Sequence, residues 1–241
     1  MINLAVRYYG YGYIDPTYIL VIIAAVISLI AQFLVSSTFS KYSRVGSYRG
    51  ITGAQAAEMI LRNQGIYDVT IRRVSGKLTD HYNPGNKTLN LSDSVYGSTS
   101  VAAVGVAAHE CGHAIQHAKG YAPLSLRSAL VPIANIGSQL SWVFIMLGVV
   151  LSFNQMLITV GIIMFSAAVL FQLVTLPVEF NASSRALKEI EAIGILNRDE
   201  TRQSRKVLVA AALTYVASAA TAILQLFRLI ILFGGRRRDD D

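Results

Sequence analysis

The length, composition and charge of the sequence exclude an ordinary soluble protein. Of its 241 residues, 53% are hydrophobic and only 15% are charged, whereas a soluble domain carries about 25% charged residues. The single cysteine excludes an internal disulfide framework, and the net charge of +7 would suit either a nucleic acid or an anionic surface.

Four apolar runs are each long enough to cross a bilayer, which takes about 20 helical residues. They cover residues 18–37, 129–151, 156–178 and 207–233, and Arg228 is the only charged residue inside them. A cleavable signal peptide has a basic start and a shorter apolar region. Because residues 1–17 lack that start, we expect the first run to be a retained transmembrane anchor.

The distribution of Lys and Arg predicts how these runs are oriented. Ten lie within residues 41–127 and six within 185–206, out of 21 in the chain. By the positive-inside rule both segments face the cytoplasm, and the uncharged loop 152–155 is an outer turn. A full crossing by the fourth run leaves Arg236–238 outside, where three aspartates neutralise them locally. The alternative is a run that bends back or lies partly in the protein. The basic charge therefore indicates membrane topology and argues against a nucleic-acid partner.

The cytoplasmic segment 40–128 is long enough to form a small folded unit. A helix is predicted for residues 52–65, because Thr52 and Gln55 form a capping-box pattern and a glycine ends the run.

Strands and a second helix are predicted further along this segment. Residues 67–75 alternate as a strand does, and residues 80–92 surround an Asn-Pro-Gly-Asn turn that predicts a hairpin. The second helix is expected from about 99 to 119, closed by Gly120.

This second helix carries the run AAHECGHAIQH, in which titratable side chains interrupt an apolar surface. His109 and His113 are four residues apart, so they lie one turn apart on one helix face, where both imidazoles can bind one zinc ion. Glu110 is displaced by about 100° around the helix, which keeps it off the metal but within reach of a water molecule there. The motif predicts a zinc hydrolase in which Glu110 is the catalytic base. Histidines hydrogen-bonded in an apolar core are the alternative.

A catalytic zinc site needs a third protein ligand. His117 continues the row of histidines, but a helix rises about 1.5 Å per residue, which places its ring about 12 Å from that of His109. We expect His117 beside the site or at the helix end. Glu179 follows the third apolar run, where a carboxylate needs a cation or a polar partner. Because the loop between the second and third runs is short, Glu179 returns to the membrane face of the H-E-x-x-H helix. It is the predicted third ligand, with an ordinary interfacial glutamate as the alternative.

Three stretches of the sequence resemble one enzyme family. HECGHAIQH, LPVEFNASSRAL and KVLVAAALTYVASAATAILQLFRL are similar to segments of the YugP-type neutral zinc metallopeptidases, which are bacterial integral membrane proteins. More distantly, the layout is similar to the HtpX heat-shock protease and the CAAX prenyl protease. The resemblance implies His109, His113 and Glu179 as zinc ligands and Glu110 as the catalytic base.

The sequence departs from the distant relatives at one position. Their pattern is E-x-x-A-D, in which the aspartate supports a zinc-bound histidine. Here E-x-x-A runs from Glu179 to Ala182, but Ser183 takes the acidic position. Asn181 and Asp80 are the candidates for supporting the histidine instead.

Peptide hydrolysis also requires groups that bind the substrate and the oxyanion. The predicted hairpin at 78–91 offers an edge strand for an extended peptide, unless Asn86 and Lys87 shield that edge. Tyr215 and Arg185 are candidates for the oxyanion by residue type. Alternatively, Tyr215 packs among the small residues of its helix, and Arg185 is a positive-inside anchor.

The sequence thus predicts a mainly α-helical integral membrane protein with about four transmembrane helices and a small cytoplasmic α+β unit that carries the H-E-x-x-H helix. The predicted segments are an N-terminal tail and first transmembrane helix (1–39), a cytoplasmic catalytic unit (40–128), a transmembrane hairpin (129–178), a cytoplasmic segment with the third ligand (179–206), and an apolar helix with a charged tail (207–241).

The expected function is that of a zinc endopeptidase of the cell membrane, with one zinc ion and an active site on the cytoplasmic side. Its expected partners are the lipid bilayer and a peptide or membrane-protein substrate, with no nucleic acid; the oligomeric state is left open. One alternative is a catalytically inactive zinc-binding scaffold. The other is a transporter or channel component that uses the titratable cluster as a proton relay.

Overall fold

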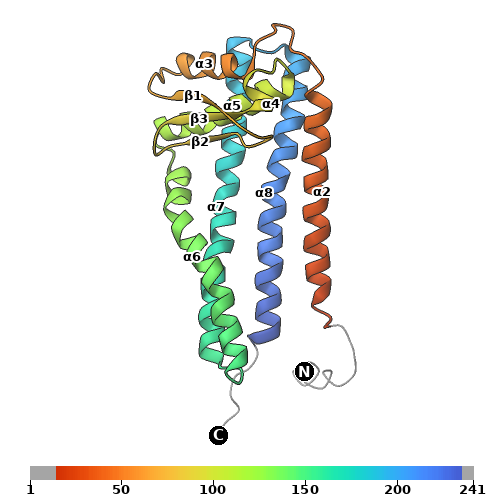
Figure 1. The fold of residues 1–241 in the computed structure, drawn as a ribbon, viewed down its shortest axis with the longest axis vertical. Coiled ribbons are helices and arrows are strands. Elements are labelled where there is room, and N and C mark those ends of the chain that lie inside the picture. The colour runs from red at the N-terminus through yellow and green to blue at the C-terminus, as the bar shows by residue number, and fades with distance from the viewer. Residues whose placement is uncertain (1–14, 235–241) are drawn as a thin grey trace. The chain divides into compact units, whose positions relative to one another are not determined.

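The computed structural model describes residues 15–234, which are mostly helical (Figure 1). The elements in chain order are α2 (Tyr18–Tyr42), α3 (Gly53–Asn63), β1 (Thr70–Val74), β2 (His81–Asn83), β3 (Thr88–Ser92), α4 (Asp93–Tyr96), α5 (Val101–Ala118), α6 (Ala122–Val150), α7 (Gln155–Ile193) and α8 (Arg198–Phe233). The predictions for the N-terminal tail before residue 15 and for the charged tail after residue 234 lie outside the described residues.

Four helices, α2, α6, α7 and α8, are long and apolar enough to cross a membrane, as the four apolar runs predicted. All four are longer than their apolar runs, and the extensions of α7 and α8 are the longest. Helix α7 continues through Pro177 to Ile193, and α8 already begins at Arg198. The fourth run is one continuous helix to Phe233 and does not bend back.

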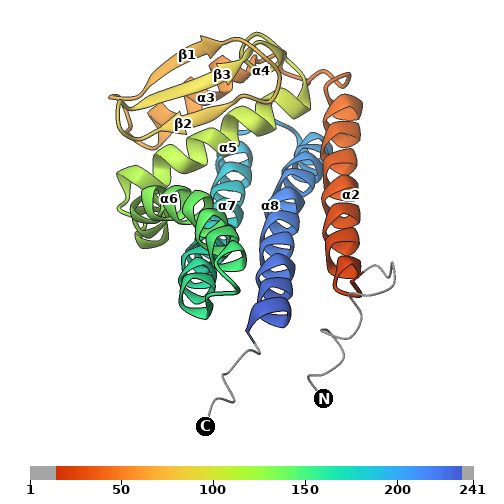
Figure 2. The ribbon, with the colours of Figure 1, turned by 60° about the horizontal axis from the view of Figure 1, so that its bottom comes forward.

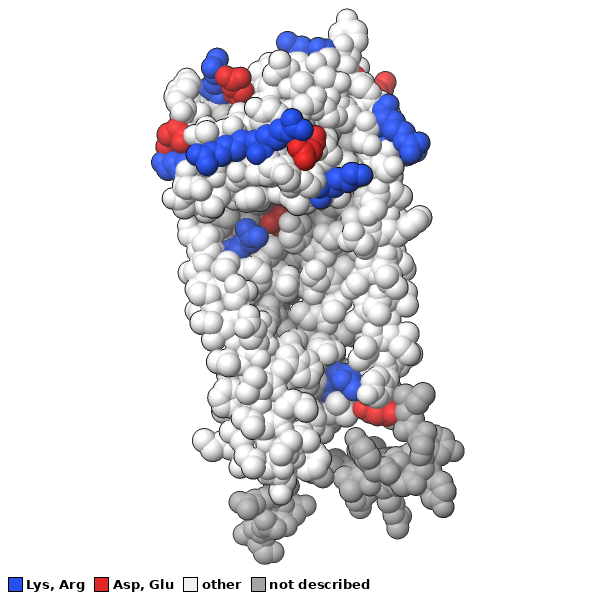
Figure 3. Space-filling model, viewed as in Figure 1, with Lys and Arg blue, Asp and Glu red and all other residues white. Residues whose placement is uncertain are grey.

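The surface of the long helices suits a lipid environment. Large apolar side chains face outward, among them Leu29 and Phe33 of α2, which are 70% and 71% exposed. Figure 3 shows the charged side chains gathered over the sheet and the elements around it, whereas the long apolar helices present an almost uncharged surface.

The described chain belongs to two compact units. Among the described residues, unit 1 contains 15–29, 129–173 and 217–234. Within it, α6 and α7 pack closely, because a Cβ on Gly161 would overlap the carbonyl oxygen of Ser141. Small residues at such contacts let helix backbones approach each other.

Unit 1 also provides partners for Arg228, the one charge in the fourth apolar run. Its Nε donates to Thr17 Oγ1 at 3.2 Å, its Nη2 lies 3.8 Å from the Asp15 carboxylate, and its guanidinium lies over the ring of Tyr18. These contacts bring the last part of α8 beside the start of α2.

Unit 2 contains residues 30–128 and 174–216. It holds a three-stranded sheet, of order β1-β3-β2, that lies against α5 (Figure 2). Strands β2 and β3 form the predicted antiparallel hairpin, with Tyr82 opposite Leu89, while β1 pairs in parallel with β3. The capping box predicted for α3 is present. Buried side chains of α3, β3 and α5 form the core of this unit.

Candidate metal centre

The centre is built on helix α5, most of whose residues are small and buried in the core of unit 2. Ser100 caps the helix by accepting a hydrogen bond from the Ala103 N–H at 3.2 Å. Gly112 lets α7 come close, because a Cβ at this position would overlap the carbonyl oxygen of Ala182. The close approach brings the H-E-x-x-H face of α5 opposite Glu179 of α7.

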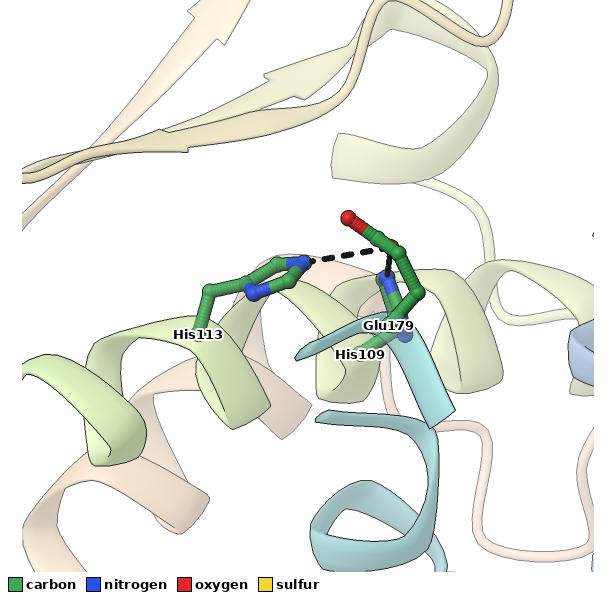
Figure 4. Close-up of side chains that lie close together, drawn as sticks. All are labelled: His109, His113 and Glu179. Atoms are coloured by element: carbon green, nitrogen blue, oxygen red, sulfur yellow. Dashed lines mark ion pairs between the residues drawn. The ribbon is translucent and has the colours of Figure 1, made fainter. Parts of the chain in front are cut away.

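Three potential ligand atoms converge between the two helices. Figure 4 shows the imidazoles of His109 and His113 and the carboxylate of Glu179 pointing toward one another. Glu179 Oε2 lies 3.3 Å from His109 Nε2 and 3.5 Å from His113 Nε2. Across residues 15–234, these three side chains are the group of His, Cys, Asp and Glu whose ligand atoms are close enough to share a metal ion, all within 4.8 Å of one another.

The surroundings of Glu179 fit a bound cation. Its side chain is only 2% exposed, and Oε2 has no hydrogen-bond partner among the described residues. A buried carboxylate oxygen without a partner costs free energy, which a metal ion bound to it offsets. Two imidazole nitrogens and one carboxylate oxygen are a donor set typical of catalytic zinc, which keeps a further position open.

Both imidazoles are supported at their other ring nitrogen. His109 Nδ1 lies 3.0 Å from Ser183 Oγ, so the serine at the acidic position of the E-x-x-A-D pattern still contacts a cluster histidine. His113 Nδ1 lies 3.0 Å from Gln116 Oε1. The sequence suggested Asn181 and Asp80 as supports of a cluster histidine. Asn181 instead accepts a hydrogen bond from Gln116, and Asp80 accepts hydrogen bonds from Ser92.

The hydrogen bonds of Gln116 fix the tautomer of His113. The Nε2 amide of Gln116 donates to the Val178 carbonyl oxygen at 2.8 Å and to Asn181 Oδ1 at 3.0 Å. This orientation turns the acceptor Oε1 toward His113, so His113 Nδ1 must carry the hydrogen. In the neutral imidazole, Nε2 then has its lone pair free and directed toward the cluster. The sequence contained a signal for this contact, because Gln116 follows His113 by three residues and therefore lies on the same face of the helix.

Glu110 and His117 of α5 both contact Tyr82 of strand β2. Glu110 is buried, and its Oε2 accepts a hydrogen bond from the Tyr82 N–H at 2.9 Å. The hydroxyl of the same Tyr82 lies 2.8 Å from His117 Nδ1. The structure therefore places His117 against β2, outside the cluster of His109, His113 and Glu179. Glu110 lies beside this cluster.

The two oxyanion candidates from sequence have different surroundings. Tyr215 lies near the carboxylates of Glu179 and Glu110 and near Arg127. Arg185 donates from Nε to Asn181 at 2.7 Å and lies over the Tyr121 ring.

Arg127 is a second residue at this site that sequence reasoning missed, after Gln116. Its Nη2 lies 3.8 Å from Glu179 Oε1. Its position next to the second apolar run was visible in the sequence, but it was counted there only as one of the positive-inside charges.

Without zinc, His113 holds a proton more firmly than an isolated histidine does. Burial acts to lower the pKa of His113, but contact with the Glu179 carboxylate and the charge of Glu110 outweigh this effect. The pKa of His113 is therefore raised above its ordinary value of 6.5. Since a proton and a metal ion compete for the same nitrogen, zinc binding is linked to pH.

The apolar helices and the His–His–Glu cluster are the features expected of a membrane-bound zinc metallopeptidase. The family model described as "Putative neutral zinc metallopeptidase" matches residues 17–234, and the chain belongs to this family. It is 47% identical over 214 residues to the "Putative membrane protease YugP" of Bacillus subtilis (strain 168), across 89% of this chain and 95% of that protein. No solved structure matches the chain. The predicted YugP-type family, zinc cofactor and multi-pass membrane character are confirmed.

Proposed function

We propose that the protein is an endopeptidase that hydrolyses peptide bonds of membrane or membrane-proximal proteins on the cytoplasmic side of the membrane, with zinc held by His109, His113 and Glu179. The observation that carries this proposal is the convergence of two imidazole nitrogens on a buried Glu179 oxygen that has no hydrogen-bond partner among the described residues. A zinc ion held by three protein ligands keeps a further coordination position for water or a substrate carbonyl group.

Zinc, when bound, supplies a Lewis acid that polarises the scissile carbonyl group and favours ionisation of water near neutral pH. Glu110 is the base in this proposal. Because the Tyr82 N–H holds Oε2 of Glu110, Oε1 takes the proton of the attacking water and passes it to the nitrogen of the leaving amine. The water oxygen bonds to the carbonyl carbon and the C–N bond breaks, which yields a carboxylic acid and an amine; the acid then loses its proton to the solvent.

The charge distribution and the sheet support the proposed side and substrate. Sixteen of the 21 Lys and Arg residues lie in segments 41–127 and 185–206, which favours a cytoplasmic location for both. Strand β2 lies at an edge of the sheet, and the N–H of its Tyr82 donates to Glu110. Such an edge suits an extended peptide that adds as a further strand.

Replacement of Glu110 by Gln tests the assigned base. With detergent-solubilised protein and quenched fluorescent peptides, E110Q should lower kcat by about 100- to 10,000-fold, while its zinc content stays equal to that of the native protein. Glu58→Gln is the matched control, because Glu58 is exposed and pairs only with Arg62 on the surface of α3. Unchanged cleavage by E110Q would remove Glu110 as the base. A native protein that binds zinc but cleaves no peptide would favour the inactive scaffold.

Replacement of Glu179 by Ala tests the third ligand. E179A should weaken zinc binding by at least about 100-fold, since even residues that only support a ligand contribute about 10- to 100-fold. Zinc content after purification without chelator is the measurement. Undiminished occupancy in E179A would contradict the assignment, and a native protein that retains no zinc would favour the proton relay.

A further inference from the structure

We propose that Arg127 is a further catalytic residue of this site, which donates to the scissile carbonyl oxygen as negative charge develops on it. This inference rests on the proposed function, because it assigns a role in peptide hydrolysis at the same cluster.

The position of Arg127 requires an explanation. It lies in the second turn of α6, one of the helices apolar enough to cross a membrane, and its side chain is only 31% exposed. Arg127 stands two residues before the apolar run 129–151, where a partly buried charge is costly unless it is paired or bound to a ligand. Its guanidinium is next to Glu179, but the distance of 3.8 Å from Nη2 to Oε1 is too long for a hydrogen bond.

Arg127 also has an unused donor. Its Nε is buried and has no hydrogen-bond partner among the described residues. By contrast, Arg185 and Arg228, which are also partly buried, donate from Nε to Asn181 and Thr17. A buried N–H without a partner costs about 1–3 kcal/mol, so Arg127 gains a hydrogen bond that the free protein lacks when its side chain turns Nε toward a substrate oxygen.

The two candidates from sequence are less suited to this role. Tyr215 carries no positive charge and lies near the Glu179 carboxylate. Arg185 is held by Asn181 and by the ring of Tyr121. Of the two arginines, Arg127 is the one whose Nε has no hydrogen-bond partner among the described residues.

The charge balance of the site supports the same conclusion. The carboxylates of Glu110 and Glu179 offset the charge of a divalent ion, so Arg127 is the charge that makes the loaded site positive. A fixed positive charge in a site shielded from water stabilises an oxyanion more than a neutral carbonyl group. Arg127 is therefore expected to act on the transition state rather than on substrate binding.

The test compares Arg127→Gln and Arg127→Lys with Arg202→Gln, whose arginine is 76% exposed and pairs on the surface with Asp199. R127Q should lower kcat by about 100- to 1,000-fold with little change in KM and with full zinc content. Its affinity for a phosphinic peptide, an anionic tetrahedral analogue of the transition state, should fall by the same factor as kcat/KM. R127K keeps the charge but loses the planar fork and should be intermediate, whereas R202Q should match the native protein.

Binding of the uncleaved peptide separates the possible roles. In the E110Q background, where the peptide is not hydrolysed, adding R127Q should leave peptide affinity unchanged. A parallel loss of peptide and phosphinic-peptide affinity would overturn the proposal in favour of ground-state binding. Loss of zinc from both R127Q and R127K would overturn it in favour of support for Glu179.

The proposed function can fail separately from this inference. It fails if the native protein neither cleaves peptides nor binds the phosphinic peptide. The role of Arg127 alone fails if the native protein is active, E110Q is inactive, and R127Q cleaves and binds the analogue as R202Q does.

Discussion

Ser183 and Gln116 orient the two cluster imidazoles through neutral side chains, each 3.0 Å from the Nδ1 atom of a histidine. Such partners fix the ring orientation and make Nε2 a better metal ligand. We expect Ser183→Ala to weaken zinc binding by about 10- to 100-fold, because the ring of His109 loses its partner. Competition with a chromophoric chelator measures the affinity directly.

The adjacent Ser184 provides the control for this prediction, because its side chain is exposed. S184A should bind zinc as the native protein does. Ser183→Asp introduces a stronger acceptor for His109 Nδ1 and should bind zinc at least as tightly as the native protein. Equal affinities of S183A and S184A would show that the serine contact does not orient the histidine.

The proximity of the cluster residues could be predicted where it depends on local geometry. His109, Glu110 and His113 lie within little more than one helical turn, so the period of the helix fixes their relation. The position of Glu179 needed one topological argument, namely that a short loop returns the chain to the same membrane face. The contacts of Arg127 depend on which side chains another helix presents to it. No local pattern encodes that information, so sequence reasoning missed this residue.

At the scale of the elements, the contact between α5 and α7 depends on Gly112. Gly112→Ala places a Cβ against the carbonyl oxygen of Ala182, a rigid backbone atom, so the helices must separate. We expect a loss of about 1–3 kcal/mol in the free energy of unfolding. Zinc affinity should fall with it, because Glu179 moves away from the histidines. Chemical denaturation in detergent and chelator competition measure the two effects.

Gly97→Ala is the matched control for this glycine. Its added Cβ would meet no atom within 4 Å, and its φ of −98° suits any L-residue. G97A should therefore retain native stability and native zinc affinity. If G112A were as stable as G97A and bound zinc equally well, the close approach of the two helices would not be what assembles the centre.

The elements that could be predicted are those specified by short-range patterns. Apolar runs predicted the four long helices, and the Asn83-Pro84-Gly85-Asn86 turn predicted the β2–β3 hairpin, which the pairing confirms. The parallel pairing of β1 with β3 was not predicted, because it joins strands without a tight turn between them. The continuation of α7 was missed because its sequence turns polar after Pro177, while the packing of Ala182, Ala186 and Ile190 in unit 2 keeps it helical.

At the scale of the whole molecule, zinc and pH together set the stability of the folded protein. In the zinc-free protein, the raised pKa of His113 means that its protonated form, next to Glu179, stabilises the folded state. This contribution is complete below the ordinary pKa of 6.5 and is lost as the pH rises through the raised value.

Zinc reverses this dependence, because it binds the neutral imidazole and competes with the proton. The difference in Tm between zinc-loaded and zinc-free protein should therefore widen as the pH rises from about 6 to about 8, since stabilisation by a ligand grows with its affinity. Thermal unfolding in detergent, with and without a chelator, measures this difference. His81→Gln should keep the widening, because the ring of His81 contacts Thr79 and Asn90 rather than the cluster. A difference that stayed constant or narrowed with rising pH would contradict competition between the proton and zinc at His113.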